Sequence, residues 1–241
     1  MQSILMCEKI IKRFGSLVAL NGVTYCIDSN KINCIIGPNG AGKTTLLNVL
    51  TGFLKPDQGR VLYHGMDITN LSAFHRARLG IVRTFQLTSV FNKLTVYENL
   101  SVSFPLISRY ERKNYEQKIR YVANLLGLED KLDKVTEKIS YGDKKKLEIA
   151  MALCLNPKIL MLDEPFAGLS DFEIDELISA LKKIKNEVAS IFLIEHKISK
   201  LVGLADRVTV LSEGSIICEG SINEVLEDRN VKKAYWGIEG E

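Results

Sequence analysis

Apolar residues along the chain occur in short runs that longer amphipathic stretches separate. Runs of this length are typical of strands buried in a mostly parallel sheet, and the stretches between them are typical of flanking helices. The strands that we expect cover residues 32–36, 81–82, 159–162, 191–194 and 208–211. Residues 1–11 mix charged with apolar positions, as a half-buried strand does. The pattern therefore predicts an α/β fold.

Helical spacing dominates two parts of the sequence. Ile174, Leu177 and Leu181 belong to one apolar stripe, and between residues 95 and 156 the strand signals vanish. Within that stretch Ile119 and Val122 share an apolar face. No repeat, low-complexity tract or Pro/Gly/Ser-rich linker divides the chain. We therefore expect one α/β body that contains an all-helical insertion.

Composition and charge exclude several classes of protein. The 32 Lys and Arg against 29 Asp and Glu leave a net charge of +3, which is too even to indicate a nucleic-acid surface. No apolar run approaches the roughly 20 residues of a membrane-spanning helix, and no secretory leader opens the sequence. The five cysteines are scattered and never spaced as CxxC, so buried reduced thiols are expected. These features indicate a cytoplasmic protein.

A phosphate-binding motif of the form GxxxxGK[ST] follows the expected strand 32–36 and precedes a helix-forming run over residues 44–50. Backbone N–H groups of such a loop turn around phosphate oxygens, and the helix N-terminus adds positive potential. Lys43 is expected on the β and γ phosphates, Thr44 on Mg²⁺ and Thr45 on the α phosphate. The motif consists of Gly37, Pro38, Asn39, Gly40, Ala41, Gly42, Lys43 and Thr44. It predicts nucleotide binding.

Two adjacent carboxylates, Asp163 and Glu164, end the expected strand 159–162. Open α/β sheets bind ligands at the carboxyl ends of their strands, beside a phosphate-binding loop of this kind. Asp163 is therefore the expected carboxylate on the metal side. Glu164 is placed to orient and deprotonate the attacking water, so the sequence predicts hydrolysis of the nucleotide as well as binding.

With these two motifs in place, nearly the whole chain resembles the ATP-binding subunits of ABC transporters. The resemblance implies that Phe14 stacks on adenine and that Gln86, after a strand over residues 80–85, contacts Mg²⁺ or the water. It also implies that His196 holds the γ phosphate. His64 and His75 lie outside any motif.

The stretch Ser140, Tyr141, Gly142 and Asp143 is similar to the signature of this family and opens a helix. Ser140 is placed to cap that helix and Asp143 to complete a capping box, and the helix N-terminus favours a phosphate. In the family this turn covers the ATP of a second cassette. The resemblance therefore implies a head-to-tail pair of identical or paralogous subunits. Tyr141 and Asp143 replace a glycine and a glutamine of the general pattern. Because Asp143 is negatively charged, the sequence does not decide whether it contacts the phosphate directly.

Several stretches resemble the branched-chain, or hydrophobic, amino-acid importers in particular. They cover residues 80–86, 140–150, 194–196 and 233–237. Phe166 is instead similar to the lipopolysaccharide-export ATPases, so those exporters and the urea or amide importers stay as alternatives. A non-transport ABC protein acting on ribosomes or DNA is a further alternative, which the single cassette, the lack of long heptads and the even charge disfavour. A switch without turnover is disfavoured by the presence of Glu164 and His196.

The resemblance implies a P-loop ATPase core with N-terminal antiparallel strands and an inserted helical subdomain. The cassette is expected over residues 4–237, with the core at 4–86 and 158–237 and the helical subdomain at about 87–157. Expected partners are transmembrane permease subunits and a separate extracytoplasmic substrate-binding protein, with no nucleic acid. The chain would lie on the inner face of the cell membrane. The permease would dock near residues 87–94, where Val90 and Phe91 are apolar.

Overall fold

The five expected strands and one further strand, β10, form a six-stranded sheet in the order β10-β9-β3-β8-β7-β6. The strands from β9 to β6 run parallel, and only β10 pairs antiparallel, with β9. The structure is a computed structural model that describes residues 3–84, 89–102 and 114–236. The strands are β3 (Ile32–Ile36), β6 (Ile81–Arg83), β7 (Ile159–Asp163), β8 (Ser190–Ile194), β9 (Arg207–Ser212) and β10 (Ser215–Gly220). The predicted mostly parallel sheet is confirmed.

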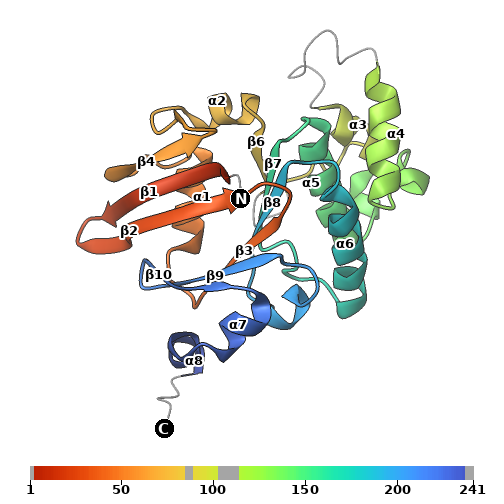
Figure 1. Ribbon diagram of the computed structural model, residues 1–241. Coiled ribbons are helices and arrows are strands. Elements are labelled where there is room, and N and C mark those ends of the chain that lie inside the picture. The colour runs from red at the N-terminus through yellow and green to blue at the C-terminus, as the bar shows by residue number, and fades with distance from the viewer. Residues whose placement is uncertain (1–2, 85–88, 103–113, 237–241) are drawn as a thin grey trace.

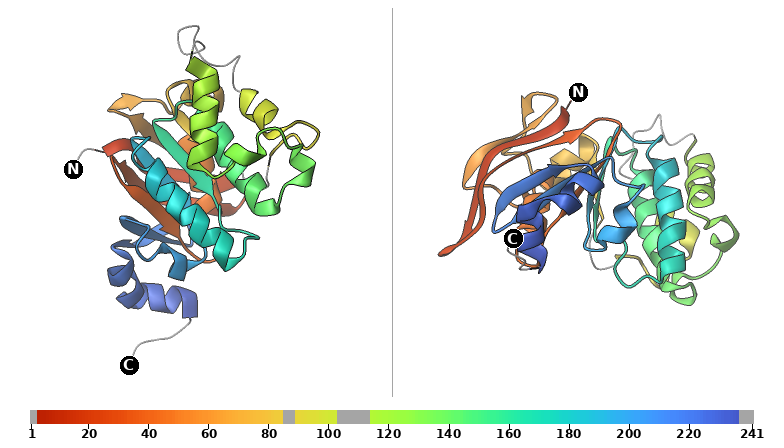
Figure 2. Two further views of the ribbon diagram at one scale, coloured as in Figure 1. Left: turned by 90° about the vertical axis from the view of Figure 1, so that its right-hand side faces the viewer. Right: turned by 60° about the horizontal axis from the view of Figure 1, so that its bottom comes forward.

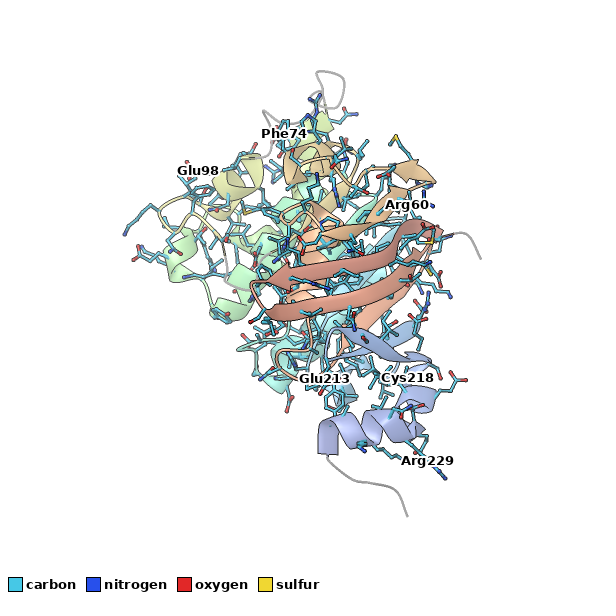
Figure 3. All side chains as sticks on the ribbon, turned by 90° about the vertical axis from the view of Figure 1, so that its left-hand side faces the viewer. Arg60, Phe74, Glu98, Glu213, Cys218 and Arg229 are labelled. Atoms are coloured by element: carbon cyan, nitrogen blue, oxygen red, sulfur yellow. The ribbon has the colours of Figure 1, made fainter. Side chains whose placement is uncertain are left out.

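A second, antiparallel sheet has the order β2-β1-β4-β5 and comes largely from the N-terminal part of the chain. Figure 3 shows its outer face, with Arg60 on β4. The strands are β1 (Ser3–Phe14), β2 (Leu17–Asp28), β4 (Gln58–Tyr63) and β5 (Met66–Asp67). Inward positions of β1 such as Leu5, Cys7 and Ile10 are buried, because one face of this sheet packs on the main sheet.

Helices cover both faces of the main sheet, and side chains that alternate along its strands separate two apolar cores. Ile35, Met161 and Phe192 pack with α1 and the antiparallel sheet, whereas Cys34 and Leu160 pack with α5 and α6. The helices are α1 (Lys43–Thr51), α2 (Ala73–Arg78), α3 (Val96–Ser101), α4 (Tyr115–Leu125), α5 (Tyr141–Cys154), α6 (Asp171–Ile184), α7 (Ile222–Glu227) and α8 (Arg229–Trp236). Short 3-10 helices span Glu129–Lys131, Thr136–Lys138 and Ile198–Leu201.

The helices α3, α4 and α5 gather on one side of the molecule, away from the antiparallel sheet (Figures 1 and 2). Between β6 and β7 the described residues form helices and turns, with one isolated bridge between Thr95 and Val135. None of the helices in the described ranges has both the length and the apolar character that a membrane crossing requires.

Two details differ from the sequence predictions. β6 ends at Arg83 instead of Phe85, although Thr84 N still donates to Met161 O at 2.9 Å, and residues 85–88 lie outside the described part of the chain. All five cysteines are free thiols as expected, but Cys26 and Cys218 are only half-buried. Burial raises the pKa of the Cys7 thiol to about 12 and that of Cys154 to about 11, which keeps both protonated.

Candidate nucleotide site

The carboxyl ends of β3, β7 and β8 meet at one edge of the main sheet. Asp163 pairs with Ile194 across β7 and β8, and Ile35 pairs with the same Ile194 across β3 and β8. The residues that follow these strands are therefore neighbours in space, although they are far apart in the sequence. This register brings the loop that begins at Gly37 together with Glu164 and His196.

The phosphate-binding loop needs glycine where its backbone approaches other segments. Gly42 has a φ of 103° at the N-cap of α1, and a Cβ there would lie 2.4 Å from Ala19 O. A Cβ on Gly37 would lie 2.0 Å from Leu211 O. Both contacts are impossible for a residue with a side chain, so the tight turn depends on these glycines.

α1 begins with the cationic and hydroxyl groups that the motif predicts. Lys43 Nζ donates to Gly37 O at 2.8 Å and to Pro38 O at 2.9 Å, so it lies folded over its own loop. Burial lowers the pKa of Lys43, and the nearby carboxylates of Glu164 and Asp163 oppose this shift. Thr44 is exposed and Thr45 half-buried. With no acidic residue in the first turn, the positive potential of the helix N-terminus is available to an anion.

Glu164 and His196 form a pair over this loop. His196 Nε2 lies 2.7 Å from Glu164 Oε1, and their side chains are 36% and 18% exposed, so both groups reach solvent. Glu164 has a φ of 49°, a left-handed conformation that is uncommon for a residue other than glycine. Its N–H donates to Ile194 O at 3.0 Å. The unusual backbone turn directs the carboxylate out of the sheet, toward the cavity.

A cavity of about 580 Å³ joins the aromatic, phosphate-binding and acidic residues. This size falls within the range of small-molecule sites in proteins. Phe14 stands at its rim, 48% exposed. The sequence analysis missed Glu213, in the turn between β9 and β10 (Figure 3). The lining residues are Phe14, Leu17, Val18, Ala19, Asn39, Gly40, Ala41, Gly42, Lys43, Thr44, Thr45, Glu164, His196 and Glu213.

Asp163, at the end of β7, uses its two carboxylate oxygens differently. Oδ2 accepts from Arg83 Nη2 at 3.2 Å, whereas Oδ1 is buried and has no hydrogen-bond partner among the described residues. Burial raises the pKa of this carboxyl, and the Arg83 guanidinium opposes the shift. A buried oxygen without a donor is what a cation ligand looks like before the cation binds. The donor set therefore fits a magnesium ion that also takes phosphate oxygens.

Glu195, which the sequence analysis noted only as part of a resemblance, is a buried carboxylate between two loops. It accepts from Phe166 N at 2.8 Å and from His196 N at 3.0 Å. Burial raises the pKa of Glu195, and these backbone N–H groups, with that of Lys197, work against the rise. Glu195 thus ties the loop after Glu164 to the loop that carries His196.

The signature turn lies apart from this cavity, because Ser140, Tyr141, Gly142 and Asp143 are absent from its lining. Ser140 caps α5 by accepting from Asp143 N at 3.0 Å, as predicted. The predicted capping box is wrong in its second half, since the carboxylate of Asp143 accepts from Lys131 Nζ at 2.8 Å instead of from the Ser140 backbone. Tyr141 is 48% exposed. The expected position of Gln86 lies outside the described residues.

Comparisons with known proteins agree with this geometry. A model of the ABC transporter family matches residues 20–167. The high-affinity branched-chain amino acid transport ATP-binding protein LivG of Escherichia coli K12 is 35% identical, over 98% of both chains.

Two further matches are a protein of an archaeon and a solved crystal structure. The probable branched-chain amino acid transport ATP-binding protein LivG of Methanocaldococcus jannaschii is 36% identical over 97% of both chains. A crystal structure of the ADP conformation of an ATP-binding cassette of an ABC transporter matches with a TM-score of 0.90 and 34% identity, over 99% of this chain and 100% of that one. The chain therefore belongs to the ABC transporter family, as a cassette that binds and hydrolyses ATP.

Proposed function

We propose that this chain supplies the energy for uptake of branched-chain or other hydrophobic amino acids, through ATP hydrolysis at the Glu164 and His196 pair. The observation that carries the proposal is the 2.7 Å contact between His196 Nε2 and Glu164 Oε1 above the phosphate-binding loop. Glu164 accepts a proton from the water that attacks the γ phosphorus, and ADP and phosphate leave. His196 orients Glu164 and donates to the γ phosphate. Lys43 neutralises phosphate charge, and Phe14 stacks on adenine.

Thr44 and Asp163, together with Gln86, are the residues that would hold Mg²⁺. The unpartnered Oδ1 of Asp163 and the exposed hydroxyl of Thr44 support this assignment. When bound, the ion neutralises charge on the phosphates. No group of three His, Cys, Asp or Glu side chains in the described ranges could hold a metal ion, which agrees with a site completed by a hydroxyl, phosphates and water.

Two cassettes are proposed to act as a head-to-tail pair. Ser140 to Asp143 would cover the ATP bound to the loop of a second subunit, identical or paralogous. The separation of this turn from the chain's own cavity supports the pair, as does the exposure of Ser140 and Tyr141 at the N-terminus of α5. ATP then favours the closed pair, and hydrolysis removes that preference.

The cassette is proposed to work at the cytoplasmic face of the cell membrane, beneath permease subunits that an extracytoplasmic binding protein loads. The names of the relatives and the stretches that resemble this importer group support the substrate class. Within residues 4–237 we assign the core to residues 4–86 and 158–237 and the helical subdomain to about 87–157. The half-exposed Phe91, 51% exposed, is the described residue that best suits permease docking.

The catalytic assignment is tested with Glu164→Gln. The variant should bind ATP with unchanged affinity, lose steady ATP hydrolysis and accumulate an ATP-bound dimer in size-exclusion chromatography. Glu227→Gln is the control, because Glu227 is an exposed carboxylate on α7 outside the cavity, and its turnover should match the wild type. Normal ATP turnover by Glu164→Gln would show that Glu164 is not the general base.

The transport assignment is tested by isolating the tagged chain from its native membranes and identifying what copurifies. Permease subunits, together with ATP-dependent uptake of leucine, isoleucine or valine into vesicles that contain them, would support the proposal. Copurification of ribosomal proteins or DNA would contradict it. Uptake of a different solute by the same complex would show that the proposed substrate class is wrong, while the assignment as a transport ATPase would stand.

A further inference from the structure

Arg83, the last residue of β6, lies buried between α1 and the proposed magnesium ligand Asp163 on β7. Its side chain is 7% exposed and that of Asp163, on the neighbouring strand β7, is 3% exposed. Arg83 pairs with Met161 in the parallel register, which places it beside the carboxyl end of β7. Arg83 therefore lies beside the strand end that carries Asp163, one of the proposed ligands of the ion.

The guanidinium joins α1 to β7 through two separate side chains. Nη2 donates to Asp163 Oδ2 at 3.2 Å, and Nη1 donates to the side-chain oxygen of Asn48 on α1. Nε donates to the carbonyl of Thr84 at 3.3 Å, which holds the guanidinium plane against the end of β6. α1 also carries Thr44, the proposed hydroxyl ligand, and β7 carries Asp163, the proposed carboxylate ligand. The Arg83 side chain therefore fixes these two elements relative to each other.

An aromatic ring covers the guanidinium on the side of α1. The carbon of the Arg83 guanidinium lies 5.2 Å from the centre of the Phe53 ring, within the range of a cation–π contact. Phe53 is itself 51% exposed, so its ring separates Arg83 from solvent. The planar guanidinium suits this position, because it stacks on a ring and donates in a fork at the same time.

A second buried arginine shows what a purely structural role looks like in this fold. Arg76 on α2 is fully buried, and its guanidinium donates to backbone carbonyls, namely those of Leu71, Val49, Leu50, Ile68 and Thr69. Arg83 differs because it binds a carboxylate of the site. It also engages only one of the two oxygens of that carboxylate and leaves Oδ1 without a described partner.

We propose that Arg83 is a positioning residue for the magnesium ion, which holds Asp163 by Oδ2 so that Oδ1 stays available and which fixes α1 against β7. The inference rests on the proposed magnesium site. Groups that hold a metal ligand in place typically contribute about 10- to 100-fold to metal affinity or activity. Arg83 is not among the residues that line the cavity, so binding of nucleotide without metal should be unaffected.

The test measures how Mg²⁺ tightens binding of a fluorescent, non-hydrolysable ATP analogue. The analogue is first titrated in EDTA, and then Mg²⁺ is titrated at a fixed analogue concentration. Arg83→Met should raise the Mg²⁺ concentration for half-maximal tightening by about 10- to 100-fold while the affinity in EDTA is unchanged. Arg83→Lys should give a smaller rise, since it keeps the charge and loses the fork.

Arg76→Lys is the matched control, because it alters a buried arginine that does not contact the site. It should lower the unfolding temperature and leave the Mg²⁺ midpoint unchanged. Asp163→Asn separates the two proposals. If Asp163→Asn raises the midpoint and Arg83→Met does not, the role of Arg83 is wrong; if neither changes it, the magnesium site itself is wrong. Should Arg83→Met fail to fold, Arg83→Lys and Asn48→Ala decide, and an unchanged midpoint in both overturns the inference.

Discussion

Lys131 Nζ donates to Asp143 Oδ1 at 2.8 Å, so the acidic residue of the signature turn is paired with a cation from outside its helix. The two side chains are 25% and 11% exposed. An unpaired carboxylate at the N-terminus of α5 would repel the phosphate that we propose this turn receives. The pairing holds the Asp143 carboxylate toward Lys131, while the N–H of Asp143 donates to Ser140 Oγ at 3.0 Å.

Lys131→Met should therefore weaken ATP-driven pairing of the cassettes. We expect a loss of about 1 kcal/mol, or roughly fivefold in the dimer dissociation constant, as for a partly buried ion pair that loses one partner. Analytical ultracentrifugation of the Glu164→Gln background with ATP measures it. Adding Asp143→Asn should restore pairing, and Lys134→Met, an exposed neighbour, should have no effect. A double variant as weak as Lys131→Met alone would contradict the charge argument.

Glu195→Ala should lower turnover without changing ATP affinity. The carboxylate accepts from Phe166 N and His196 N, so its loss frees both loops that carry the Glu164 and His196 pair. Misplacement of such groups by a fraction of an ångström to an ångström costs about tenfold to a hundredfold in rate. Steady-state ATPase assays give kcat and KM separately. A change confined to KM would show that Glu195 acts on nucleotide binding instead.

Phe14→Ala should weaken binding of ATP, because its exposed ring is the aromatic surface at the cavity rim. Stacking of a base on an aromatic side chain contributes about 1–3 kcal/mol. Phe14→Tyr should keep the affinity, and Phe74→Ala, an exposed phenylalanine on α2 away from the cavity, is the control. Calorimetry with ATP and with inorganic triphosphate distinguishes the cause: triphosphate binding should not change. Equal losses for both ligands would rule out adenine stacking.

Asp28 should make stability depend on pH in the acid range. Burial alone would raise the pKa of its carboxyl, but Lys31 Nζ at 2.8 Å and Arg207 outweigh this and lower it below the usual value. The folded state then binds the proton less readily than the unfolded state, so the pair stabilises the fold above pH of about 4 and ceases to do so as pH falls through the lower, folded pKa.

Urea unfolding of Asp28→Asn at several pH values tests whether this carboxylate stabilises the fold more at neutral pH than at acid pH. The variant should be less stable than the wild type by about 1.5–3 kcal/mol at pH 7, the range for hydrogen bonds to a charged group. The difference should shrink toward pH 3, where the wild-type carboxyl takes up its proton. A difference that stays constant from pH 7 to pH 3 would show that Asp28 acts through shape and not through charge.

The parts of the fold that follow from local pattern were predictable from the sequence. The apolar strands, the helix after Lys43 and the carboxylates after residue 162 carry their signal in consecutive residues. The orientation of Asp143 was not predictable, because its partner lies on a preceding turn and either a cap or an ion pair satisfies the same spacing. Arg83 and Glu195 stood within recognised stretches, but burial decides their roles, and burial depends on which strands become neighbours.

The left-handed backbone at Glu164 has a consequence for the evolution of stability. In this conformation a residue with a Cβ lowers the free energy of unfolding by about 1 kcal/mol or more relative to glycine. The backbone is therefore strained at the position where the site needs a carboxylate. Selection for heat resistance alone would therefore favour glycine or asparagine here. Selection for ATP hydrolysis would favour glutamate. Selection for stability and selection for activity therefore act in opposite directions at this residue.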